Sequence, residues 1–177
     1  MAKRKKKTKI DTLSIVLLLL IAVGAICAIV GLFTDWFVST TTSALLGSES
    51  STNYGLFAEE FTSWAEAAAE NENSNLFPIA LVQSISIGAA VLAGVCLLFS
   101  LLSNLGIFSL GGLIKLILSI AAGVLGVFVI INAGSYIGSL AVVDLGVIVE
   151  STWTMTVGVY LTGVGAIIAG AGYLLSK

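Results

Sequence analysis

The sequence predicts an all-α membrane bundle of four transmembrane helices that carries a small extracellular β-sheet and a short helix. Hydrophobic residues make up 58% of the 177-residue chain and charged residues only 10%, whereas soluble domains carry about 25% charged residues. The apolar residues form four long blocks, and about 20 apolar residues suffice for a helix to cross a bilayer. Two polar segments between these blocks are long enough to fold outside the membrane.

The distribution of charge predicts the orientation of the four spans. Six basic residues lie between Lys3 and Lys9, before the first block, and Lys115 and Lys177 lie at the start of the third and at the end of the fourth. Because Lys and Arg are retained on the cytoplasmic side, we expect a multi-pass protein of the plasma or cytoplasmic membrane with both termini inside. Most acidic residues fall in the opposite loops, namely Asp35, Glu49, Glu59, Glu60, Glu66, Glu70, Glu72, Asp144 and Glu150.

The boundaries follow from the apolar blocks. The first block is long for a signal peptide, which favours an uncleaved anchor, and the second opens at Pro78, the only proline. The predicted segments are a basic cytoplasmic tail (1–12), the first span (13–33), extracellular loop 1 (34–77), the second span (78–102), a cytoplasmic loop (103–112), the third span (113–137), extracellular loop 2 (138–152), the fourth span (153–175) and a cytoplasmic end (176–177).

Extracellular loop 1 has the composition of two strands followed by a helix. Segments 37–46 and 51–57 are rich in β-branched and aromatic residues and flank a polar turn, which predicts a hairpin. Segment 58–72 favours an amphipathic helix, with Phe57, Phe61, Trp64 and Ala68 on one face. Extracellular loop 2 contains segment 141–150, which we expect to add a strand.

Small residues recur at a spacing of four along the spans. Such spacing lets two helix backbones approach closely, which is how helices commonly associate in lipid. An intramolecular bundle is the favoured interpretation, and lateral contact with another membrane protein is the alternative. The residues are Gly158, Thr162, Ala166 and Gly170 in the fourth span, Ser86, Ala90 and Gly94 in the second, and Gly24 with Ala28 in the first.

Residues that support catalysis or transport are scarce in this sequence. It contains no histidine, the commonest general base and metal ligand at neutral pH. No acidic or basic residue falls at mid-membrane depth, and Lys115 is close enough to the inner boundary to extend its side chain to the headgroups. Gln83 and Asn132, the amides within the spans, are expected to hydrogen-bond between helices. We therefore expect no enzyme activity, cofactor, metal, nucleic-acid partner or small-molecule substrate.

One short constellation resembles a known family. Asp35-Trp36-Phe37 follows the first span and Tyr54-Gly55-Leu56-Phe57 comes later in the same loop. The order and spacing are similar to the W…GLW signature of claudins and of the wider claudin-like tetraspan superfamily. The resemblance implies that Trp36, Gly55, Leu56 and Phe57 anchor the sheet to the outer surface of the bundle. Phe57 stands in place of the family's second tryptophan, and the cysteine pair that follows in claudins is absent.

These observations lead to three hypotheses about function. The first is a claudin-like structural or protein-interaction role through the ectodomain, as a homo-oligomer or with a partner membrane protein in the lipid bilayer. The second is an auxiliary or regulatory subunit of a channel, transporter or enzyme complex, docked through the small-residue stripe of the fourth span. The third is a cation-selective pore. The acidic outer loops support this hypothesis, whereas the lack of charged residues within the spans argues against it.

Overall fold

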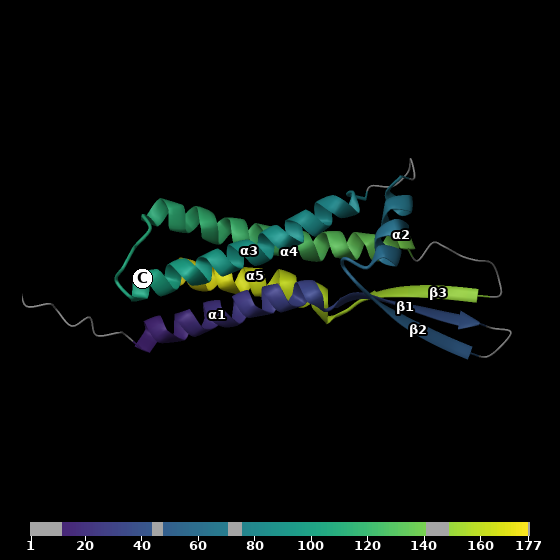
Figure 1. Cartoon of the computed structure of the whole chain (residues 1–177), viewed down its shortest axis with the longest axis horizontal. Coiled ribbons are helices and arrows are strands. Elements are labelled where there is room, and N and C mark those ends of the chain that lie inside the picture. The colour runs from purple at the N-terminus through teal and green to yellow at the C-terminus, as the bar shows by residue number, and fades with distance from the viewer. Residues whose placement is uncertain (1–11, 44–47, 71–75, 141–148, 177) are drawn as a thin grey trace, which may run out of the picture.

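Four long helices lie side by side, and a three-stranded antiparallel sheet projects from one end of the bundle (Figure 1). The computed structural model describes residues 12–43, 48–70, 76–140 and 149–176. Four of its helices are long and apolar enough to cross a membrane. The elements, in chain order, are α1 (Thr12–Phe33), β1 (Asp35–Ser43), β2 (Ser48–Gly55), α2 (Glu59–Ala69), α3 (Ile79–Asn104), α4 (Gly112–Leu140), β3 (Val149–Met155) and α5 (Val157–Leu175).

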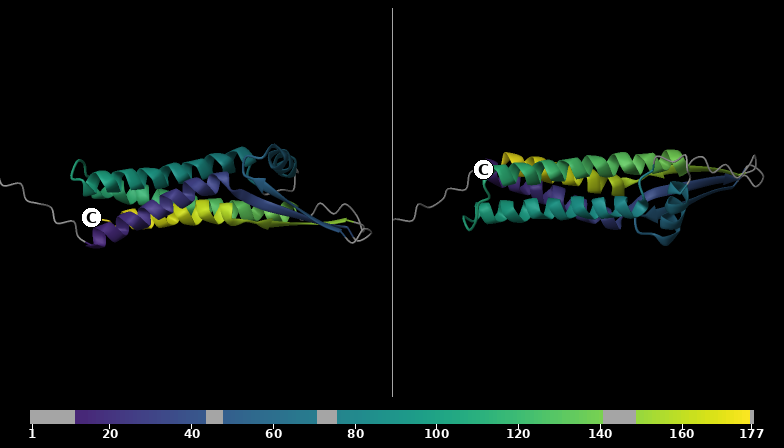
Figure 2. Two further views of the ribbon diagram at one scale, coloured as in Figure 1. Left: turned by 60° about the horizontal axis from the view of Figure 1, so that its bottom comes forward. Right: turned by 90° about the horizontal axis from the view of Figure 1, so that it is seen from above.

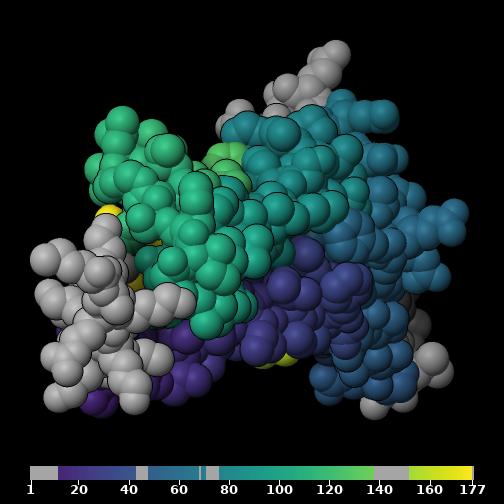
Figure 3. All heavy atoms as spheres, turned by 60° about the vertical axis from the view of Figure 1, so that its left-hand side comes forward, coloured from purple at the N-terminus to yellow at the C-terminus, as the bar shows by residue number. Residues whose placement is uncertain are grey.

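Helix α5 is the most deeply buried of the four long helices. It packs against α1, α3 and α4, and in the space-filling view it shows only as small yellow patches between its neighbours (Figure 3). The outward faces of α1 and α4 are covered with large apolar side chains, which suits contact with lipid. Those that are at least 55% exposed are Leu13, Val16, Leu19, Val23, Ile26 and Phe33 on α1, and Leu113, Ile117, Val124 and Ile131 on α4.

Glycine allows α5 to touch its neighbours backbone to backbone. A Cβ atom on Gly24 of α1 would lie 2.7 Å from the Gly165 carbonyl oxygen, and one on Gly165 would lie 2.6 Å from the Gly24 carbonyl oxygen. On another face of α5, a Cβ atom on Gly163 would lie 2.8 Å from the carbonyl oxygen of Gly126 in α4. These distances are shorter than any real Cβ contact, so a larger residue at these positions would separate the helices.

The small-residue stripe of the fourth span is divided between neighbours inside the molecule. Its four residues, Gly158, Thr162, Ala166 and Gly170, are all buried. Thr162 lies against Gly31 of α1, whereas a Cβ atom on Gly170 would lie 2.7 Å from the Ser119 carbonyl oxygen of α4. The stripe therefore serves the intramolecular packing that the sequence favoured.

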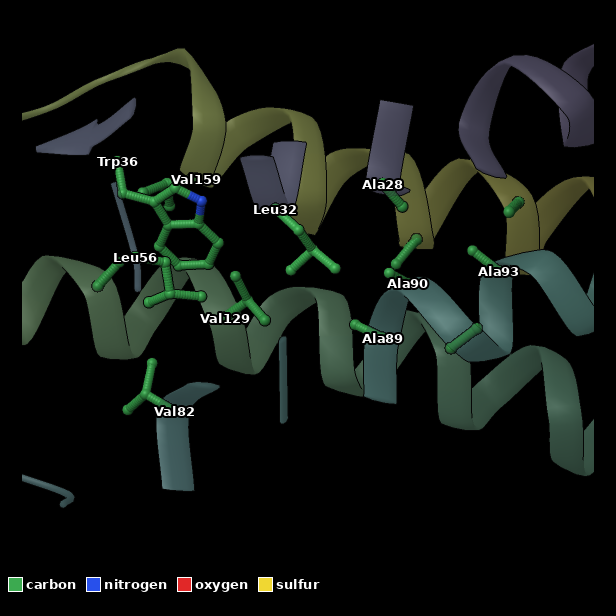
Figure 4. Packing of buried hydrophobic residues seen from close by; sticks show 14 of the residues in the cluster. Ala28, Leu32, Trp36, Leu56, Val82, Ala89, Ala90, Ala93, Val129 and Val159 are labelled. Carbon is green, nitrogen blue, oxygen red and sulfur yellow. The ribbon is translucent and has the colours of Figure 1, made fainter. Parts of the chain in front are cut away.

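Helix α3 contributes small residues to its contact with α1. Ser86 and Ala90 are buried, and Ala90 points toward Ala28 of α1 (Figure 4). Gly94 differs from them, because it is half-buried and a Cβ atom there would meet nothing within 4 Å. The predicted packing role of Gly94 therefore has no structural support.

The end of α3 that lies away from the sheet closes with a Schellman motif. The N–H of Gly106 donates to the Ser103 carbonyl at 3.0 Å, and the N–H of Ile107 donates to the Leu102 carbonyl at 3.1 Å. Gly106 has a φ of 69°, the one positive φ among the described residues. A glycine is favoured here because a Cβ atom is unfavourable in the left-handed conformation.

The fourth span begins later than the sequence indicated. Its predicted start at Trp153 is wrong, since Trp153 lies in β3 and α5 begins at Val157. Residues up to Met155 extend the sheet by pairing with β1, with Trp153 opposite Ser39 and Met155 opposite Phe37. The apolar character of Trp153 serves the sheet rather than the membrane span. The strand expected within 141–150 overlaps β3 only at Val149 and Glu150, and residues 141–148 lie outside the described residues.

The sheet continues directly from two of the helices. Its strand order is β2-β1-β3, so β1 is central and pairs antiparallel with both neighbours. Thr34 alone separates α1 from β1, and Thr156 alone separates β3 from α5. Strands β1 and β3 therefore extend from the ends of α1 and α5 with no more than one residue between strand and helix (Figure 2). The predicted hairpin of loop 1 is seen as the β1–β2 pair, with its turn at 44–47 outside the described residues.

Candidate functional site: the junction of sheet and bundle

A β-bulge turns Trp36 into the bundle. The register of β1 against β2 shifts between Asp35, which faces Gly55, and Phe37, which faces Tyr54. Trp36 is therefore the extra residue of the bulge, a feature that re-aims side chains. In consequence, both Trp36 and Phe37 are buried, at 0% and 1% exposure, although consecutive residues of a regular strand point to opposite faces.

The Trp36 side chain ties the start of the sheet to the end of α1. Its indole Nε1–H donates a hydrogen bond of 2.7 Å to the carbonyl oxygen of Gly31, one of the last-turn carbonyls that a helix leaves without an internal partner. The ring lies near Leu56, Val129 and Val159 (Figure 4). A Cβ atom on Gly158 would lie 2.7 Å from its Cδ1, so a glycine in the first turn of α5 makes room for the ring.

The other predicted anchor residues, Gly55, Leu56 and Phe57, differ in burial. Leu56 is 1% exposed and joins the core, but Phe57 is 47% exposed and points away from it. The carbonyl of Gly55 accepts the N–H of Ala58 at 3.1 Å, which closes a tight turn. Gly55 has no positive φ, and a Cβ atom there would meet nothing within 4 Å. The turn thus exists without requiring a glycine.

Helix α2 lies across the ends of α3 and α4 that are near the sheet (Figure 1), and its buried face is narrower than predicted. Phe61 and Ala65 are both fully buried, four residues apart. Trp64 is 49% exposed and so lies at the edge of this face. Phe57 precedes the helix, and the Ala68 side chain is outside the described residues. The i, i+4 pair of Phe61 and Ala65 therefore carries the docking of α2.

Aromatic rings connect the sheet, α2 and α4 through the centre of the junction. Phe37 of β1 stacks on Phe61 of α2 with ring centroids 4.4 Å apart, and Phe61 meets Tyr136 of α4 edge-on at 6.2 Å. Tyr136 and Phe37 are each 1% exposed. Such pairs contribute about 0.5–1.5 kcal/mol beyond the burial of their area, so this stack fixes the position of α2 over the bundle.

A second group of rings lies further out, and we call it the outer aromatic cluster: Tyr54, Trp64 and Trp153. Tyr54 stacks on Trp153 at 5.3 Å, and Trp64 meets Trp153 at 5.2 Å and Tyr54 at 6.2 Å. Exposure rises from 5% for Trp153 to 49% for Trp64. The cluster therefore has a buried base on the sheet and an accessible rim on α2.

Hydrogen bonds complete the junction. Gln83 of α3 donates to the Leu56 carbonyl, between β2 and α2, at 3.0 Å, and to the Thr62 hydroxyl at 3.4 Å. The second bond joins α3 to α2, a bond between helices as expected. The hydroxyl of Tyr136 donates to the Phe77 carbonyl, and that of Thr156 donates to the Asp35 carbonyl. Asn132 behaves differently from its prediction, since it donates to Phe128 of its own helix at 2.8 Å.

Among the residues that the structure describes, no three His, Cys, Asp or Glu side chains lie close enough to hold a metal ion. No family model and no curated protein matches the chain. The junction holds a small sheet at a fixed angle to four apolar helices.

Several junction residues escaped the sequence analysis. Phe37 and Tyr54 belong to the segments that carry the family resemblance but were given no anchoring role, and Tyr136 and Trp153 were not among the predicted site residues, although each makes ring contacts there. Alternation along β1 predicts that Phe37 shares a face with Ser39 and Thr41, and that signal could have been used. The position of Trp153 depends on the pairing of β3 with β1, a contact between residues far apart in sequence.

Proposed function

We propose that the protein is a claudin-like four-span integral membrane protein with a structural or protein-interaction role through its ectodomain. The observation that carries the proposal is the attachment of the sheet. Single-residue joints at Thr34 and Thr156, the Trp36 hydrogen bond and the aromatic stack hold the sheet rigidly on the bundle. A presented surface of this kind gains binding affinity from its pre-organisation.

The proposed orientation places both termini in the cytoplasm and the sheet outside. It rests on the positive charge of the amino-terminal segment and on the acidic residues of the two opposite loops. α1 and α5 both meet the sheet at the same end of the bundle, as this orientation requires. Protease added to sealed cells should remove an epitope tag inserted between Ser43 and Ser48 and spare one at either terminus. The reverse pattern would refute the orientation.

The same proposal includes self-association or binding to a neighbouring membrane protein. Purification from native cells in mild detergent, with particle mass and co-purifying proteins measured together, tests it. We expect a homo-oligomer or a defined complex. A monomer without stoichiometric partners, both in detergent and in nanodiscs, would contradict an interaction role.

The auxiliary-subunit alternative loses the feature that supported it. It used the stripe Gly158–Gly170 as a lateral docking face, but all four stripe residues are buried against parts of the same chain. A stoichiometric channel, transporter or enzyme subunit in the purification would restore that alternative. The docking face would then have to be an outward apolar face of α1, α3 or α4.

A further inference from the structure

We propose that the outer aromatic cluster and the adjoining face of the sheet bind neutral oligosaccharides. The inference is independent of the proposed self-association. It starts from Trp64, whose ring is 49% exposed while its neighbours Trp153 and Tyr54 hold it from one side. A ring that is fixed in this way offers its free surface to a ligand at little cost in side-chain entropy.

The polar atoms of this cluster are available for a ligand. Within the described residues, neither the indole N–H of Trp64 nor the hydroxyl of Tyr54 makes a hydrogen bond to protein. Tyrosine and tryptophan combine an apolar ring with a polar tip that usually has a partner. A pyranose ring has a C–H face that can stack on an aromatic ring. Its hydroxyls can accept hydrogen bonds from the Trp64 N–H and the Tyr54 hydroxyl, so a sugar suits both the rings and their polar groups.

Acceptors and hydroxyls surround the rim. Glu60 is exposed and precedes Trp64 by one helical turn, so the two side chains share a side of α2. Ser50 and Thr52 are exposed and precede Tyr54 in β2 at intervals of two residues, so they lie on the same face of the sheet as Tyr54. Carboxylates accept strong hydrogen bonds from hydroxyls. The cluster thus presents ring, carboxylate and hydroxyl groups together, the combination that a sugar requires.

The charge of the ectodomain selects among saccharides. The two segments 34–77 and 138–152 contain no Lys or Arg, so their charged side chains are all Asp or Glu and carry negative charge. Acidic sugars and phosphorylated glycans would be repelled and would find no basic partner there. The geometry and the charge together point to an uncharged sugar chain.

The test uses the full chain in nanodiscs, because detergents with sugar headgroups would compete. Cellohexaose and mannohexaose serve as neutral probes, hexagalacturonate as an acidic probe and the chitosan hexamer as a cationic probe, each titrated by calorimetry. We expect a neutral probe to bind and the acidic probe not to bind. Trp64→Leu should weaken the neutral binding by about three- to tenfold, because it keeps apolar packing on Trp153 but removes the ring.

The matched control is Phe57→Leu, which alters another half-exposed aromatic residue, 47% exposed, outside the cluster. It should leave neutral binding unchanged. Glu60→Gln provides a second variant, which should weaken neutral binding through the loss of a charged acceptor without disturbing the buried core. Absence of binding by both neutral probes, binding of the chitosan hexamer alone, or equal binding by wild type and Trp64→Leu would each overturn the proposal. Particle mass in the same nanodiscs tests self-association separately.

Discussion

At the scale of single residues, Trp36 has the largest role in the junction. Its ring is fully buried and its Nε1–H completes the end of α1. Trp36→Phe removes that hydrogen bond and part of the ring volume, so we expect a loss of about 1–3 kcal/mol in the free energy of unfolding. Thermal unfolding in detergent measures it. Trp64→Phe is the control, and an equal effect of both variants would contradict the role assigned to Trp36.

Thr162 illustrates a buried polar group without a partner. Its side chain is fully buried and its hydroxyl oxygen makes no hydrogen bond in the described part of the chain. Replacing an unpaired buried hydroxyl with a methyl group of similar shape removes a desolvation penalty. Thr162→Val should therefore leave stability unchanged or raise it by about 1 kcal/mol. Marked destabilisation on thermal unfolding would show that the hydroxyl has a partner, such as a bound water.

Gly55 offers a residue-scale test of the family resemblance. The resemblance gives this glycine an anchoring role, yet its backbone has no positive φ and a Cβ atom would meet open space. Gly55→Ala should be neutral or stabilise by about 0.4–1 kcal/mol through the unfolded state. Gly106→Ala is the contrasting variant, because the φ of 69° there disfavours a Cβ atom. Similar melting temperatures for both variants would refute this distinction.

At the scale of elements, contact between α1 and α5 depends on glycine. A Cβ atom on Gly165 would lie 2.6 Å from backbone atoms of Gly24 and Ala28, and backbone cannot move aside as a side-chain tip can. Gly165→Ala should cost about 1–3 kcal/mol of stability. Gly94→Ala, in open surroundings, should be neutral or favourable because alanine has the higher helix propensity. Resistance of the folded protein to detergent unfolding provides the comparison.

Lys115 joins the ends of α4 and α5 that lie away from the sheet. Its Nζ donates to the Ser176 carbonyl and lies 5.5 Å from the centroid of the Tyr173 ring. The sequence predicted only that this side chain extends toward the headgroups. The structure gives it a partner at the carboxyl end of α5, where a positive charge is favourable because the helix dipole is negative there.

The elements that local sequence determines were the ones predicted well. Apolar blocks predicted the four long helices, and two segments rich in β-branched and aromatic residues predicted the hairpin. The start of α5 was misplaced because the composition of Trp153–Thr156 suits both a helix end and a strand. Only pairing with β1, far away in the sequence, decides between them. The exposure of Trp64 and Phe57 likewise depends on where α2 docks.

At the scale of the whole molecule, charge should control orientation. The basic residues before α1 are the main positive charge of the chain, and such residues resist translocation. Changing Lys3, Arg4, Lys5, Lys6, Lys7 and Lys9 together to Gln should give a mixture of orientations. Protease protection of terminal tags in sealed vesicles measures the two populations. A single orientation in this variant would mean that the hydrophobic spans or the ectodomain determine the topology.

The joints at Thr34 and Thr156 have a mechanical consequence. α1 has 22 residues and α5 has 19, which correspond to about 33 and 28 Å of helix, close to the hydrocarbon thickness of about 30 Å. A bilayer that becomes thinner makes such helices tilt. Because one residue leaves no slack between each helix and its strand, the tilt is passed on to the sheet. The angle at which the sheet stands above the membrane therefore follows the thickness of the lipid beneath it.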